Sequence, residues 1–263
     1  MIMNIRYYLV LIVLTTLLSA HTVAQSPLQK YVGAEAGICF ISAKMPEMEF
    51  IRGDIPAYPG GYSSTYLKSF MNKSYAGIKA EFLSVNNRFG FSSGLRYIQM
   101  NSSVGRNTYW AGNTNYFYLM YLQEGVNTEY LKVKELDQRT SYLGIPLEAR
   151  FFPYNARLFR VYFKLGADVG FKLQSRTDVV FYNQSMDYLE DEVADLIGRP
   201  ESVSASLTVS AGVRIGRASK PAINLEAGLP TIFLTSGTSG LVNPLYGGGF
   251  QVSFQLPVKP KTK

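Results

Sequence analysis

The segment LFRVYFKLGADVGFKLQ, residues 158–174, decides the fold, because apolar and polar side chains alternate along its whole length. A β-strand places successive side chains on opposite faces. The pattern therefore predicts a long strand that separates two different environments. One face carries Phe159, Val161, Phe163, Leu165, Ala167, Val169, Phe171 and Leu173, and the other carries Arg160, Tyr162, Lys164, Gly166, Asp168, Gly170, Lys172 and Gln174.

Seven further segments show the same alternation, so eight strands are predicted. They cover approximately residues 31–45, 75–85, 89–101, 141–152, 202–216, 222–233 and 246–258. No Asp, Glu, Lys or Arg lies on the apolar face within any of the eight cores. The charged residues of the opposite face are Glu35, Lys79, Glu81, Arg96, Glu148, Arg150, Arg160, Lys164, Asp168, Lys172, Arg214 and Glu226.

Two observations indicate that the charged face lies inside. Nearly all strand glycines are on this face, and glycine in a strand is useful where other groups crowd the backbone, as they do inside a narrow barrel. The predicted connections also alternate between short turns and long loops, which is typical of outer-membrane barrels. Pro146 and Pro230 interrupt strand patterns, so we expect a bulge or a lost hydrogen bond at each.

Composition excludes several classes of protein. The chain of 263 residues is 47% hydrophobic and 14% aromatic, too rich in both for a disordered chain. Only 17% of its residues are charged, against about 25% in an ordinary globular domain. A mean hydropathy of +0.01 does not fit a bundle of transmembrane helices. These values fit a sheet with one face in lipid.

Residues 1–24 read as a secretory signal peptide, with Arg6 in the positive region and Thr22-Val23-Ala24 at the cleavage site. A membrane anchor or buried helix is the alternative. Cleavage leaves residues 25–263 as one barrel domain and removes His21, the single histidine. Cys39 is the lone cysteine and has no partner for an internal disulfide.

Six segments resemble the PorT-like outer-membrane β-barrel domain family. That resemblance implies a small eight-stranded barrel of the Gram-negative envelope. The family's best-known members assist protein secretion, but no motif here carries that role over. The segments are FGFSSGLRY (89–97), YLGIPLEARFFP (142–153), VYFKLGADVGFKL (161–173), VSAGVRIG (209–216), INLEAGL (223–229) and FQVSFQL (250–256).

The predicted interior holds seven cations and five anions, the twelve charged residues given above. Eight strands leave room only for side chains, so we expect a plug of ion pairs; a narrow, weakly anion-selective conduit is the alternative. A catalytic triad needs a histidine and a zinc site needs several Cys or His ligands, but after signal cleavage the chain has no histidine and one cysteine. A mechanism using only Glu148, Asp168 or Glu226 remains open, although each has cationic neighbours. We expect no enzyme activity, no cofactor and no metal.

The long loops are the candidates for binding. Aromatic residues Tyr109, Trp110, Tyr116, Tyr118 and Tyr121 suit a protein or glycan partner, or they belong to an aromatic hairpin that turns near Trp110. In the third loop, Met186, Leu189, Val193 and Leu196 have helical spacing beside several acids. This pattern predicts a short amphipathic helix, or an acidic docking surface.

The sequence therefore predicts an all-β protein: a closed eight-stranded antiparallel up-and-down transmembrane β-barrel in the outer membrane. Its expected partners are the lipid bilayer and a protein or glycan at the extracellular loops, and no nucleic-acid footprint is present. The expected role is structural or an interaction through the loops. A narrow pore, an accessory of envelope transport or secretion, and a soluble lipocalin-like calyx are the alternatives.

Overall fold

The computed structural model describes residues 29–46, 51–52, 67–84, 86, 88–106, 116–121 and 129–258. The predicted signal peptide lies outside these ranges. Among the described residues no helix is long and apolar enough to cross a membrane. The elements are β1 (Gln29–Lys44), β2 (Ile51–Arg52), β3 (Leu67–Leu83), β4 (Phe89–Arg106), β5 (Phe117–Tyr121), β6 (Glu129–Asn155), β7 (Phe159–Phe181), η1 (Gln184–Leu189), α2 (Glu190–Leu196), β8 (Val203–Ile215), β9 (Ala222–Phe233) and β10 (Asn243–Val258).

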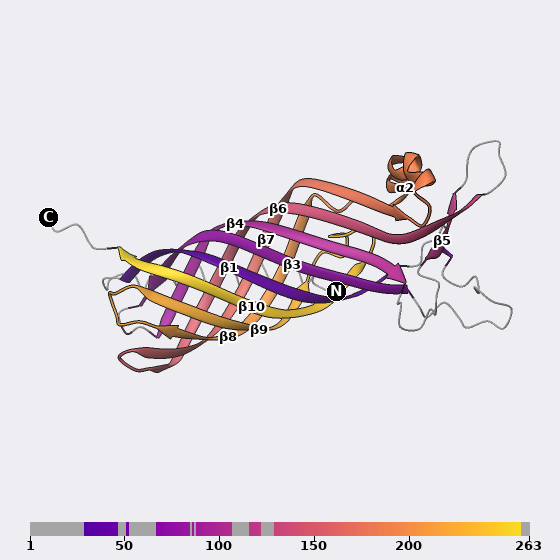
Figure 1. Cartoon of the computed structure of the whole chain (residues 1–263). Helices are drawn as coiled ribbons and strands as arrows, with labels where there is room; N and C mark the ends of the chain where they lie inside the picture. The colour runs from indigo at the N-terminus through magenta and orange to yellow at the C-terminus, as the bar shows by residue number, and fades with distance from the viewer. Residues whose placement is uncertain are drawn as a thin grey trace, which may run out of the picture.

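The strands form one antiparallel ten-stranded sheet in the order β2-β5-β6-β4-β3-β1-β10-β9-β8-β7. β6 also pairs with β7, so eight of the strands form a ring in which each has two neighbours. The two remaining strands are short: β5 pairs with the start of β6, and β2 pairs with β5. Figure 1 shows the strands of the ring running obliquely along a long axis.

The apolar face of the ring looks outward, as predicted. On β7 the side chains of Phe163 and Leu165 are 51% and 60% exposed, whereas Lys164 between them is 4% exposed. On β6 the outward apolar residues run from Leu143 to Phe151, a length that matches the roughly 9–11 residues a tilted strand needs to cross a bilayer. We call this outer apolar surface the belt.

Several strands continue past the belt at the end that carries the long loops. β6 begins at Glu129, not near residue 141, and β3 begins at Leu67, not near residue 75. In this extension of β6 the two faces exchange character: Leu131 and Val133 are buried, while Lys132 is exposed. The alternation continues through this part of the strand, but it now describes a sheet with water outside and an apolar core inside.

The pairing is irregular at each of the two prolines, Pro146 and Pro230, as well as at other places such as Ser42–Ala43 on β1. At Pro230 the register shifts on both sides of β9, so residues 229 and 230 face one residue on each neighbouring strand. The predicted bulge at Pro230 is therefore confirmed. Opposite Pro146 the pairing of β6 with β4 is interrupted without a shift, because Ser93 pairs with Leu147 and Arg96 pairs with Gly144. Proline has no N–H for the ladder, which accounts for this gap.

Short turns lie at one end of the ring, which we call the turn end, and long connections lie at the other, the loop end (Figure 1). The turns join β3 to β4, β6 to β7 and β8 to β9. The loop end contains an apolar core to which the strand extensions, α2 and residues 241–242 contribute. Its buried members include Met71, Val104, Leu136, Val193 and Leu241. The predicted filling by ion pairs therefore describes only the part of the interior that the belt surrounds.

Candidate functional site: a buried ion-pair network inside the ring

Because side chains alternate along each strand, the charged side chains that lie between the apolar residues of the belt point into the interior of the ring. Eleven of the twelve predicted interior charges are at most 8% exposed. They are Glu35, Lys79, Glu81, Arg96, Glu148, Arg150, Arg160, Lys164, Asp168, Arg214 and Glu226. Isolated charges at such burial would be very costly, so their pairing decides whether the fold tolerates them.

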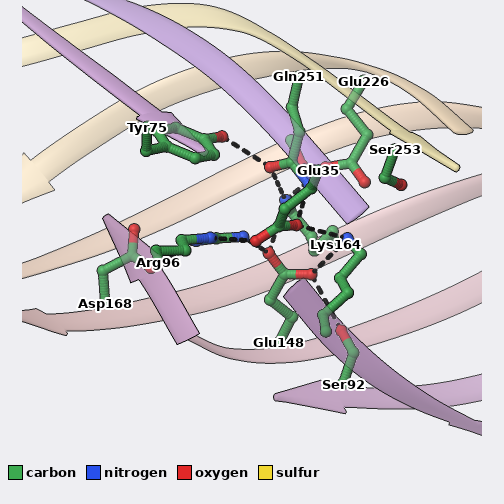
Figure 2. A network of polar contacts seen from close by, with 12 residues as sticks. Glu35, Tyr75, Ser92, Arg96, Glu148, Lys164, Asp168, Glu226, Gln251 and Ser253 are labelled. Carbon is green, nitrogen blue, oxygen red and sulfur yellow. Dashed lines mark hydrogen bonds and ion pairs between the residues drawn. The ribbon is translucent and has the colours of Figure 1, made fainter. Parts of the chain in front are cut away.

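Arg96 on β4 lies at the centre of the half of this network nearer the loop end. Figure 2 shows its side chain pointing toward Glu35 and Glu148. Its guanidinium forms ion pairs with Glu35, Glu148 and Asp168, which come from three different strands. Lys79 adds a second cation to Glu35 at 2.8 Å between Nζ and Oε2. A guanidinium can serve several acceptors in its plane at once, and here it connects β4 to β1, β6 and β7.

Arg150 on β6 has the same role nearer the turn end. Its Nη1 lies 2.7 Å from Glu81, and its Nη2 lies 2.8 Å from Glu226 and 3.2 Å from Glu148. Arg214 forms a second ion pair with Glu81. Because Glu148 contacts both arginine centres, the two halves form one connected network.

Neutral side chains satisfy the remaining carboxylate oxygens and ammonium protons. Gln251 donates to Glu35 at 2.9 Å, and its Oε1 accepts from Tyr75 at 2.7 Å and from Lys164 at 3.0 Å. Ser92 donates to Glu148 at 3.0 Å. Figure 2 shows these side chains converging on the same carboxylates from several strands. These hydrogen bonds fix the carboxylates and ammonium groups in place, whereas Nε of Arg150 and Nε and Nη2 of Arg214 have no partner among the described residues.

Two cations depart from the predicted inventory. Lys73 was missed because β3 was predicted to start near residue 75; it is 2% exposed, and its Nζ lies 3.0 Å from Asp168. Lys73 stands two residues before Tyr75, so extending the period-two pattern by one step would have placed it on the inward face with Tyr75. Lys172 is only half-buried and donates to the carbonyl oxygen of Pro200 beyond the network.

Glycine makes room for the large side chains of the interior. A Cβ on Gly37 would lie 2.5 Å from the ring of Tyr75, and a Cβ on Gly212 would lie 2.6 Å from the ring of Tyr162. Both tyrosines point into the network: Tyr75 donates to Gln251 at 2.7 Å, and Tyr162 donates to Glu226 at 2.7 Å. The glycines on the charged face therefore have the packing reason that the sequence predicted.

Little free space remains among these groups. One cavity of about 40 Å³ lies among Lys73, Tyr75, Arg96, Glu148 and Asp168. One water molecule needs about 10–15 Å³ on this measure, so the cavity has room for a few waters and for no larger solute. Among the described residues, no three side chains of the types His, Cys, Asp and Glu are grouped as a metal site would require.

The loop end is closed by the segment between β9 and β10. Ser239 donates to Gln138 at 3.1 Å and shares a hydrogen bond of 2.7 Å with Ser102, and the backbone N–H of Gly240 donates to Gln138 at 2.6 Å. Leu241 is fully buried in the apolar core. This segment therefore lies inside the ring and covers the network from the loop side. The segment is too short to show a periodic pattern, so the sequence alone does not reveal that it lies inside the ring.

The predicted loop residues have different outcomes. Tyr109 and Trp110 lie outside the described residues. Tyr116 and Tyr118 form an edge-to-face pair with centroids 5.6 Å apart. Tyr121 is 8% exposed and its hydroxyl donates to Glu192, so it ties β5 to α2 and is not an open contact surface. β5 pairs antiparallel with the start of β6. The predicted hairpin turn near Trp110 lies outside the described residues.

The predicted amphipathic helix in the third loop is present as η1 and α2. Leu189 and Val193 are buried as expected. Leu196 is 43% exposed, and Ile197 at the end of the helix is buried in its place. The three acids of the first turn, Glu190–Glu192, complement the positive helix end.

No protein-family model matches the chain, and no curated protein sequence matches it. Among solved structures, the chain is similar to the outer membrane protein OprG from Pseudomonas aeruginosa, with 12% identity and a TM-score of 0.43 over 89% of this chain and 98% of that chain. It is also similar to the translocator domain of the autotransporter NalP from Neisseria meningitidis, with 7% identity and a TM-score of 0.28 over 89% and 91%. A third similar structure is the beta domain of the Bordetella autotransporter BrkA, with 10% identity and a TM-score of 0.25 over 89% and 100%.

Proposed function

We propose that this protein is an integral outer-membrane β-barrel. In this proposal residues 25–263 form a closed eight-stranded up-and-down barrel after a signal peptide, residues 1–24, is removed. The interior is filled, and the role is structural or an interaction through the loop end, without catalysis or a cofactor. Membership of the PorT-like family belongs to the same proposal and rests on the six segments quoted above.

The observation that carries the proposal is the orientation of the two faces. Leu147 is 46% exposed while Glu148 beside it is 2% exposed, and this inversion of the soluble pattern repeats around the ring. A soluble calyx needs its charged face in water. A lipid-facing band with polar groups inside is the arrangement of a transmembrane barrel.

The filled interior supports a structural role over a conduit. The ion-pair network crosses the ring from Glu35 on β1 to Glu226 on β9, and the cavity among Lys73, Arg96 and Asp168 has a volume of only about 40 Å³. The loop that carries Leu241 covers the network from the loop end. An ion that passed through would have to displace several buried ion pairs.

The loop end supplies the surface for an interaction. Tyr116 and Tyr182 pack with centroids 5.0 Å apart, and the Nζ of Lys132 lies 4.9 Å from the ring of Tyr116. Aromatic and basic side chains of this kind suit a glycan or protein partner. Candidates that stand in this proposal are Tyr109, Trp110, Tyr116 and Tyr118.

Membrane fractionation tests the location. The protein should sediment with the outer membrane, and its gel mobility should change on heating, because a closed barrel resists detergent until it is heated. Recovery in the soluble periplasmic extract would contradict the proposal and favour the soluble lipocalin-like calyx.

Planar bilayers test the filled interior. The purified protein should give no stable single-channel currents. Reproducible conductance steps would overturn the plug and favour the narrow pore.

A further inference from the structure

A pocket of about 320 Å³ lies at the turn end, between the β6–β7 turn and the β8–β9 turn. Three arginines line it, Arg157 and Arg217 from the turns and Arg160 from the start of β7, together with Asn155, Ala156 and Ala218. No carboxylate is among these lining residues. The ion-pair network described above does not account for this cluster.

Arg160 is the unusual member, because it is 2% exposed and forms no ion pair with a carboxylate within the described ranges; the hydroxyl of Tyr31 is the polar group beside its guanidinium. Glu81 is the carboxylate that interacts with Arg160 electrostatically, and it already pairs with Arg150 and with Arg214. A buried guanidinium with unused donors is costly unless an anion meets it. Its guanidinium lies 5.8 Å from the ring centroid of Phe152, a contact that holds the side chain but offers no acceptor.

The register of β7 and β8 adds to this cost. Arg160 and Arg214 are direct cross-strand partners, and like charges in that position destabilise a sheet. Nε and Nη2 of Arg214 also lack a partner among the described residues. Within the described ranges, two buried guanidiniums therefore lie opposite each other, and Glu81 is the carboxylate that interacts with both.

The pocket is rigid on both sides. The backbone N–H of Gly216 donates to the carbonyl of Leu158 at 2.9 Å and so links the two turns. Ser219, whose φ is 57°, donates through its backbone N–H to the hydroxyl of Tyr31 at 3.0 Å. The ring of Tyr31 in turn lies 4.2 Å from the guanidinium carbon of Arg214. These contacts hold the backbone of the two turns that carry Arg157 and Arg217.

The charge around the pocket has one sign. The described residues of the three turns include Arg88, Arg157, Arg217 and Lys220 and no Asp or Glu. The exposed apolar residues Phe159 and Tyr154 place the pocket where the belt ends. This is the depth at which lipid phosphates lie in a bilayer.

We propose that the turn end carries a binding pocket for a phosphoryl anion, lined by Arg157, Arg160 and Arg217, in which the exposed Arg157 and Arg217 contact the anion and the buried charge of Arg160 attracts it. A phosphoryl group offers several acceptor oxygens to guanidiniums that approach from different directions, whereas a carboxylate offers only two. Phospholipid headgroups and soluble phosphate share this chemistry. The lipid source rests on the membrane location proposed above, whereas the pocket itself does not.

The first arm of the test uses the intact protein in a neutral detergent at about 0.15 M salt, where long-range attraction is screened. Inorganic phosphate is titrated by calorimetry. The second arm measures the thermal midpoint in phosphatidylcholine vesicles with and without phosphatidylglycerol. Binding in the first arm identifies soluble phosphate as sufficient; a stabilisation by phosphatidylglycerol alone identifies the lipid headgroup.

Arg160→Met and Arg88→Met are the matched variants, because Arg88 is exposed on another turn at the same end and does not line the pocket. Arg160→Met should weaken binding at least tenfold without lowering stability, since it replaces an unpaired buried charge by an apolar side chain. Arg88→Met should bind as the wild type does. If Arg160→Met fails to show heat-modifiable mobility, the exposed Arg217→Met, with a several-fold loss, replaces it. Equal binding by the pocket variant and the wild type, or no binding in either arm, overturns the proposal.

Discussion

Glu148→Gln tests whether the ion-pair network holds the interior together. The carboxylate of Glu148 lies 3.2 Å from Arg150, 3.2 Å from Lys164 and 3.5 Å from Lys79, and it also pairs with Arg96. Glutamine has nearly the same shape, so the substitution removes one charge and leaves the packing in place.

The gross electrostatic loss is large. At an effective dielectric constant of about 20, one ion pair at 3.2 Å is worth roughly 5 kcal/mol. Much of this is offset, because glutamine costs less to bury and every cation keeps another acid; Lys164, for example, keeps Glu226. Breaking a buried ion pair costs about 3–5 kcal/mol in net terms, and we expect a destabilisation in this range.

Urea unfolding in phosphatidylcholine vesicles, followed by heat-modifiable gel mobility, measures the difference. Asp195→Asn is the matched control, because Asp195 pairs with Arg199 at 3.3 Å while both side chains are largely exposed. An exposed pair contributes about 0–1 kcal/mol. If Glu148→Gln costs no more than the control, the network does not stabilise the fold and our account of the interior is wrong.

Two further predictions concern the outside of the ring. Val209→Arg puts a charge in the belt and should cost about 2–4 kcal/mol and block assembly into the membrane, whereas Tyr188→Arg on the exposed η1 should assemble normally; equal assembly of the two variants would contradict the face assignment. At the loop end, burial and the carboxylates of Glu135 and Asp178 raise the pKa of Asp137. Its contribution to stability is therefore fully present below its unfolded pKa of about 4 and is lost as the pH rises through the folded value. Asp137→Asn should accordingly raise the thermal midpoint at pH 7 and change it little at pH 3.5. An unchanged midpoint at both pH values would show that ionisation of Asp137 does not destabilise the fold.

Much of the fold could be read from alternation alone. β9 has the predicted limits, residues 222–233, and the bulge at Pro230 follows from the missing N–H of proline. The inward orientation of Glu148 and Arg150 could be predicted because a strand has only two faces. Nearly all strand glycines lie on the same face as these two residues, which marks it as the crowded interior. The extension of β6 from Glu129 was missed because its apolar residues face the opposite environment there.

The sequence by itself determined the eight strands of the ring, the belt and nearly all of the buried charges, because each of these is a local property of alternating side chains. Only the tertiary structure decided which charges pair, how the segment around Ser239 and Leu241 closes the loop end, and that Arg160 faces Arg214 at the turn end. These features depend on the register between strands and on a loop that folds back into the ring. Contacts between residues far apart in the chain leave no periodic signal along it.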